Sequence, residues 1–115
     1  MTPLQIACMV HPKLEKEKKD RENIIDILLK YGARVNVVSK ETLWTPLNWL
    51  CLYGDIQLAR KFVTKHGALI NLPDHRGLFP IDYAGGVRKQ NEEMIMLLLA
   101  EFKERFRKFT EAANT

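Results

Sequence analysis

The sequence has few of the features that mark secreted, membrane-spanning or disulfide-stabilised proteins. Its 115 residues contain two cysteines, too few for a disulfide framework or a metal cluster. The longest uninterrupted apolar run, Met94 to Ala100, is far shorter than the roughly 20 residues that a membrane-spanning helix needs. The N-terminus also lacks the basic-then-apolar pattern of a signal peptide. These absences predict a reducing compartment, the cytoplasm or the nucleus.

An excess of charge of one sign is also missing. The 18 basic residues are offset by 14 acidic ones, which leaves a net charge of +4, and the two signs alternate along the chain. Nucleic-acid-binding domains usually gather positive charge on one face. The composition therefore argues against nucleic acid as the partner. The length and the hydrophobic fraction of 46% fit a single globular domain.

Three segments of the chain resemble one another. They begin with the triplets Thr2-Pro3-Leu4, Thr45-Pro46-Leu47 and, in weaker form, Phe79-Pro80-Ile81. The starts are 43 and 34 residues apart, and an insertion of about nine residues in the first segment explains the longer spacing. The first two segments continue with a helix-period apolar stripe and close with Gly-Ala and then Asn, at Gly32 and at Gly67.

This pattern resembles three ankyrin repeats, at about 2–36, 37–71 and 72–100, followed by a C-terminal helical extension and tail at 101–115. The resemblance implies an all-α solenoid of helix pairs joined by hairpin-like fingers. Since the chain starts inside the first repeat, we expect a piece of a longer repeat protein. Helix pairs of this kind bury their apolar stripes by stacking on their neighbours.

Local chemistry supports each part of the motif. Pro3, Pro46 and Pro80 suit the first position of a helix, where the missing N–H costs nothing. Thr2 and Thr45 can cap the same helices, because a side-chain oxygen accepts a hydrogen bond from a free amide.

The ends of the helices and the fingers are also predictable. Gly32 and Gly67 suit a left-handed residue after the second helix of a pair, and Gly85-Gly86 is interpreted as the terminator of a short helix. The first finger, Ser39 to Leu43, is one residue longer than the second and has no glycine at its turn. The sequence therefore does not predict the geometry of its tip.

Nothing in the sequence has the spacing of a catalytic or metal-binding motif. His11, His66 and His75 are scattered, and no His or Cys pair has ligand spacing. Cys8 and Cys51 occupy equivalent places in successive repeats and are interpreted as small buried residues. We therefore expect no metal, no cofactor and no enzymatic activity.

The resemblance implies a concave protein-binding face, formed by the finger tips and by the exposed side of each first helix. Carried over position by position, the predicted contact residues are Lys40, Leu43, Trp44, Leu52, Tyr53, His75, Arg76 and Leu78, with Met9, Val10, Val87 and Arg88 beside them. Trp44 has two interpretations: an exposed anchor for a partner, or a side chain folded onto Pro46 or the next repeat. Trp49 is expected in the core.

Two charged segments have two interpretations each. The insertion from Lys13 to Glu22 is either a solvated segment, as a helix extension or mobile loop, or a partner-specific contact, since insertions in repeats often lie on one face. The tail continues the last apolar stripe through Phe102, Phe106 and Phe109, with Arg105 and Arg107 on other faces. It is either a capping helix packed on the last repeat or a basic amphipathic helix. The latter would dock a neighbouring domain, a partner groove or, weakly, an anionic membrane surface.

The resemblance implies a non-catalytic protein–protein interaction module, a scaffold or regulatory subunit within a larger assembly. Its rigid concave surface would present Trp44, Leu52, Tyr53 and the finger charges to a protein partner. The alternative is a regulatory ankyrin segment of a larger membrane-associated channel or enzyme, with the basic C-terminal helix as the connector.

Overall fold

The computed structural model describes residues 1–85 and 91–114. Within these ranges the chain forms six helices and no strand. The helices are α1 (Pro3–Met9), α2 (Glu15–Lys30), α3 (Pro46–Tyr53), α4 (Ile56–Thr64), α5 (Pro80–Ala84) and α6 (Glu92–Ala113). The predicted all-α fold is confirmed. Gly86, Val87 and Arg88, on which predictions fell, lie outside the described residues.

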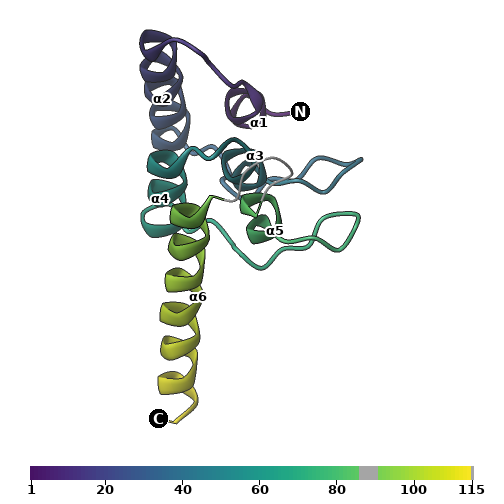
Figure 1. Ribbon diagram of the computed structural model, residues 1–115, viewed down its shortest axis with the longest axis vertical. Helices are drawn as coiled ribbons and strands as arrows, with labels where there is room; N and C mark the ends of the chain where they lie inside the picture. Colours follow the sequence, from purple (N-terminus) through teal and green to yellow (C-terminus); the bar gives the residue numbers. More distant parts are fainter. Residues whose placement is uncertain (86–90, 115) are drawn as a thin grey trace.

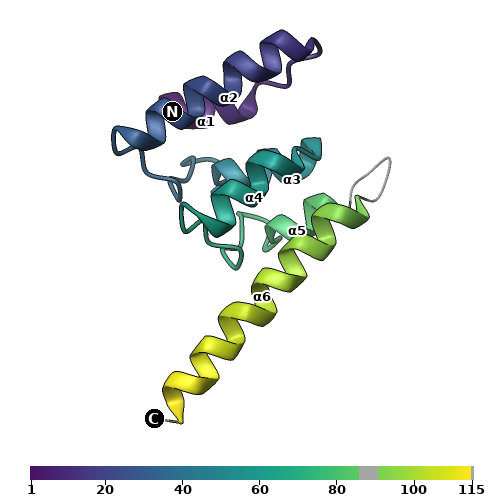
Figure 2. The ribbon, with the colours of Figure 1, turned by 90° about the vertical axis from the view of Figure 1, so that its left-hand side faces the viewer.

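The helices form two layers (Figure 1). The long helices α2, α4 and α6 line up as an outer column, and the short helices α1, α3 and α5 lie beside them as an inner row. The two fingers project from the inner row, on the side away from the column. Figure 2 shows the pairs stacked along the chain, with the second half of α6 running on past α5.

The helix starts follow the predicted chemistry with one exception. Proline stands in the first turn of α1, α3 and α5. Thr2 caps α1, since its hydroxyl accepts from the Gln5 amide at 3.2 Å and the Gln5 side chain accepts from the Thr2 amide at 2.6 Å. The predicted Thr45 cap is wrong. The amide of Asn48, which the hydroxyl would need, donates instead to the Thr45 carbonyl at 3.1 Å.

The helix ends agree with the predictions from glycine. Gly32 and Gly67 are left-handed, with φ of 93° and 67°. Gly85 directly follows α5, where φ is −66°, so it ends this helix in a right-handed conformation.

Each finger is closed by two backbone hydrogen bonds, one of them between its first residue and the residue that follows its turn. The Ser39 amide donates to the Trp44 carbonyl at 3.1 Å, and the Asp74 amide donates to the Leu78 carbonyl at 2.8 Å. Leu43, with φ of 58°, takes the left-handed position that Gly77 occupies in the second finger. The first finger therefore makes the same kind of turn without a glycine, at the cost of strain in a non-glycine residue.

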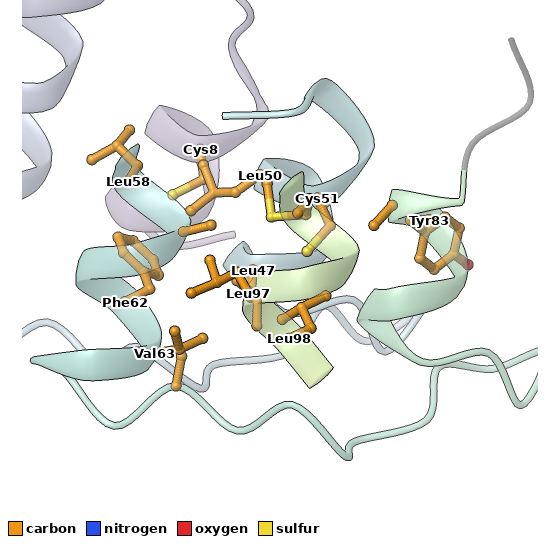
Figure 3. Packing of buried hydrophobic residues seen from close by; sticks show 14 of the residues in the cluster. Cys8, Leu47, Leu50, Cys51, Leu58, Phe62, Val63, Tyr83, Leu97 and Leu98 are labelled. Atoms are coloured by element: carbon orange, nitrogen blue, oxygen red, sulfur yellow. The ribbon is translucent and has the colours of Figure 1, made fainter. Parts of the chain in front are cut away.

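The core lies between the two layers (Figure 3). Its largest members include Leu47, Leu50 and Phe62, which are at most 1% exposed, and the free thiols of Cys8 and Cys51 are buried with them. Burial raises the pKa of both thiols to about 12, because a buried thiolate would lose its hydration. The prediction of two buried packing cysteines is confirmed.

The charged insertion is a helix extension, because α2 begins at Glu15. One residue of the insertion is not solvated. Arg21 is 7% exposed and donates to the carbonyls of Ala7 at 2.8 Å and Cys8 at 3.1 Å, and to Asp55 Oδ2 at 2.5 Å. This guanidinium joins the first helix pair to the second.

Candidate protein-binding face

One side chain of each inner helix belongs to the face between the inner row and the fingers. Ile6, Trp49 and Tyr83 each stand three residues after the proline that begins α1, α3 or α5. Because the three helices start in the same way and are stacked, these positions form a column across the three helix pairs. Ile6 is 46% exposed, Trp49 is half-buried and Tyr83 is 8% exposed.

Aromatic rings run across this face without a break, and we call them the aromatic row. The row consists of His11, Tyr53, Trp49, Trp44 and Tyr83. The ring centroids of successive members are 4.4 Å, 6.0 Å, 4.5 Å and 4.5 Å apart, two stacked contacts followed by two edge-to-face contacts. Such ring pairs add to the stability that burial alone provides. The row therefore connects all three helix pairs and the base of the first finger in one rigid surface.

The row is fixed by one buried carboxylate. Asp74, at the base of the second finger, accepts from the backbone amides of Arg76 at 2.8 Å and Leu78 at 3.0 Å. Its other oxygen accepts from the indole N–H of Trp44 at 3.0 Å and from the Tyr83 hydroxyl. One side chain thus shapes its own finger and holds two rings of the row.

Two opposing effects set the pKa of the Asp74 carboxyl. Burial raises it, because the charged form loses water. Hydrogen bonds from Tyr83, from the amides of Leu78 and Arg76 and from Trp44 lower it, and the net result is a pKa of about 2, below the usual 3.8. The carboxylate is therefore charged at every physiological pH.

The finger tips add charge to one end of the row. The Arg76 guanidinium donates to the Tyr83 hydroxyl at 3.1 Å and lies 6.0 Å from the ring centroid. His75 ties the fingers together, because its amide donates to the Thr42 carbonyl at 2.9 Å and its Nδ1 lies 3.0 Å from the same oxygen. Lys40 is exposed on the first finger.

The predicted contact residues differ in exposure. Leu52 and Leu43 are 38% and 42% exposed, Tyr53 is half-buried, and Leu78 is half-buried against the core. Trp44 is half-buried as well, folded onto the aromatic rings of the second and third helix pairs. The second interpretation of Trp44 is therefore confirmed, and an exposed Trp44 indole is not part of the face.

Three members of the row were not predicted as contact residues. Trp49 was expected in the core; it packs against the buried cluster but is only half-buried, and its ring contacts Trp44 and Tyr53. Tyr83 and His11 were not assigned to the face at all. The shared spacing of three residues after proline would have found Trp49 and Tyr83. No local pattern marks His11, whose ring reaches Tyr53 from the connection after α1.

The C-terminal helix corrects two further expectations. Phe102, Phe106 and Phe109 are 56%, 62% and 70% exposed, so the interpretation as a cap packed on the last repeat is wrong. Arg105, predicted to dock a partner, is used inside the chain. It donates to the carbonyls of Val63 at 3.2 Å and Ala68 at 2.7 Å, where α4 ends. This contact turns the phenylalanine stripe away from the stack.

Arg107 lies on the solvent side of α6. It pairs with Glu104 at 2.6 Å and Glu111 at 2.5 Å along the same helix. These pairs are exposed, so each stabilises the helix only slightly. They also neutralise part of the positive charge that the sequence pattern assigned to this segment.

Comparison with known proteins identifies the class to which this architecture belongs. The ankyrin repeat family model matches residues 1–40, which comprise the first helix pair and the start of the first finger. Residues 1–40 therefore contain an ankyrin repeat. That the second and third helix pairs are further repeats stays our prediction, supported by their common layout. No curated protein matches the chain.

The described residues offer no group of three His, Cys, Asp or Glu side chains that could hold a metal ion. Among the same residues, no helix is long and apolar enough to cross a membrane.

Proposed function

We propose that this chain is a non-catalytic interaction module that binds a protein partner along the aromatic row and the finger tips. Ankyrin repeats are in general protein–protein interaction modules. The observation that carries the proposal is the row itself, five rings held across three helix pairs and anchored by Asp74. A surface so fixed loses little conformational freedom when a partner binds.

The chemistry of the face suggests the kind of partner. Leu52 and Tyr53 offer an apolar patch at the middle of the row. The finger tips carry the basic side chains of Lys40 and Arg76, against one acidic side chain, Glu41. We therefore propose an apolar partner segment with acidic residues at the end that meets the fingers. Charges at the rim would mainly set the association rate and the orientation.

Site-specific photo-crosslinking in the cells that produce the protein tests this proposal. A benzophenone amino acid replaces Leu52 on the inner helix α3 in one chain and, as the matched control, exposed Arg60 on the outer helix α4 in another. We expect a discrete covalent adduct with another protein at position 52 and none at position 60. Adducts at position 60 alone, or at neither position, would contradict the proposal.

The adduct also provides the partner for calorimetry. Removing an anchor from the centre of an interface costs about 2 kcal/mol or more, so we expect a loss of this size for Tyr53→Ala. Trp44→Ala should weaken binding by a similar amount, because it removes the ring that contacts Trp49 and Tyr83 and the hydrogen bond to Asp74. Trp44→Phe, which keeps a ring but loses the bond to Asp74, separates shape from hydrogen bonding. Unchanged affinity in Tyr53→Ala would remove the row from the interface.

A further inference from the structure

The two ends of the stack expose apolar side chains on the long helices. On α2, Ile24 and Ile27 are 52% and 55% exposed. On α6, Met96, Leu99 and Phe102 are 66%, 43% and 56% exposed. End units of repeat stacks usually carry a polar outer face, because an apolar one invites association. The first and last helix pairs of the given sequence both have such an apolar outer face.

The joint between α2 and α4 shows how neighbouring long helices meet. On α4, Leu58 is 3% exposed and lines a hollow together with Arg21 and Glu22 of α2. Beside it, Lys61 Nζ pairs with Glu22 Oε1 at 2.6 Å and with Asp26 Oδ2 at 3.5 Å, both on α2. This joint therefore places a buried apolar residue of α4 beside an ion pair, in which a position of α4 that faces backward to α2 meets a position of α2 that faces forward to α4.

Equivalent positions can be read along the three long helices. The backward-facing apolar position is Ile24 on α2, Leu58 on α4 and Met94 on α6, and Met94 is fully buried. Lys61 lies three residues after Leu58 on α4, and Ile27 lies three residues after Ile24 on α2. Ile27 is therefore the backward-facing residue equivalent to Lys61.

The same count gives the forward-facing positions. Asp26 lies two residues after Ile24 on α2, and Met96 lies two residues after Met94 on α6, so Met96 is the residue equivalent to Asp26. Val63, 3% exposed where α6 covers α4, corresponds to Leu99, which is 43% exposed. The end of α6 thus carries Met96 and Leu99 where an inner joint has a charged residue and a buried valine.

The faces at the two ends match each other. If the α2 end of one chain were set on the α6 end of another in the geometry of the inner joint, Ile27 would meet Met96. At the inner joint the corresponding pair is Lys61 and Asp26. Charged partners have thus been replaced by apolar ones at both ends together, and Ile24 and Leu99 would extend the same contact.

We propose that this chain associates end to end with a second copy of itself, the α6 end of one chain covering the α2 end of the next. The contact continues the joint that already exists between α2 and α4, so no new packing geometry is required. Because the two surfaces differ, the contact is heterologous and each chain keeps one free end. Association therefore proceeds beyond a dimer as the concentration rises.

Sedimentation velocity on the full 115-residue chain tests the proposal, over a range of about 5 µM to 500 µM suited to a small interface. We expect the average mass to rise with concentration. Ile27→Lys and Met96→Asp each set a charge against an apolar side chain and should weaken association at least about tenfold. Val38→Lys, at a residue 42% exposed beside the first finger, is the matched control and should associate like the wild type.

A mixture of the two end variants is the decisive arm. An Ile27→Lys chain and a Met96→Asp chain together restore a lysine opposite an aspartate, as at the inner joint, while their other ends stay native. We expect the mixture to associate more strongly than either variant alone. A wild-type chain that stays monomeric throughout the range overturns the proposal. So does an equal effect of Val38→Lys, or a mixture that stays monomeric. Circular dichroism confirms that each variant is folded.

Discussion

The carboxylate of Asp74 makes its contribution to folding in a defined pH range, which allows a direct test of the way the binding face is built. Four donors surround it, from Trp44, Tyr83 and the amides of Arg76 and Leu78. Its pKa is lowered from 3.8 to about 2. A lowered pKa means that the folded chain favours the charged form, so the stabilisation is complete above pH 4 and is lost as the pH falls toward 2.

The shift gives the size of the effect. One pKa unit corresponds to 1.36 kcal/mol, so the lowering of the Asp74 pKa is worth about 2 kcal/mol, or about 30-fold in the folding equilibrium. Asp74→Asn keeps the shape of the side chain but cannot ionise. We therefore expect the difference in the free energy of unfolding between wild type and Asp74→Asn to shrink by about 2 kcal/mol between pH 7 and pH 2.

Urea unfolding between pH 2 and pH 7, followed by the fluorescence of Trp44 and Trp49, measures this difference. Glu41→Gln is the matched control, because it removes a carboxylate from the exposed tip of the neighbouring finger. Its difference from wild type should change by less than about 0.5 kcal/mol over the same range. The reasoning is refuted if the unfolding free energies of wild type and Asp74→Asn run parallel from pH 7 to pH 2.

Three further predictions concern the framework that carries the face. Leu43→Gly should raise the free energy of unfolding by about 1 kcal/mol in thermal denaturation, because glycine adopts the positive φ at this position of the first finger without strain. A destabilised variant would show that the backbone at Leu43 is not strained. Arg105→Met should lower the free energy of unfolding by about 2 kcal/mol, since two backbone carbonyls lose a charged donor, whereas exposed Arg107→Met should lower it much less; equal losses in urea unfolding would contradict this. Cys8 and Cys51, with pKa values of about 12, should resist an aromatic disulfide reagent at pH 8 until urea unfolds the chain, and fast native labelling would show the burial to be wrong.

The sequence predicted those parts of the fold that depend on chemistry within a few residues. The proline in the first turn of each inner helix, the cap by Thr2 and the left-handed Gly32 and Gly67 are all local preferences. The repeat of these signals at similar spacing was enough to indicate stacked helix pairs. The Thr45 cap shows the limit of this reasoning, because the competing backbone bond depends on how the finger enters the helix.

Contacts between distant residues were beyond the sequence pattern. Arg21 and Arg105 looked like surface charges on helices, yet each donates to backbone carbonyls that other helices leave free at their ends. Only the stacked arrangement creates those acceptors. For the same reason Trp44 could be placed near the face but not at its site between Trp49, Tyr83 and Asp74.

The most direct test of the proposed binding face is an amide chemical-shift map of the labelled chain, recorded with and without the partner recovered by crosslinking. We predict that the largest shifts fall on the aromatic row and the finger tips, at Leu52, Tyr53 and Arg76 above all, while the outer surface of α4 changes little. Shifts concentrated on the outer helices, with the row unchanged, would contradict the account.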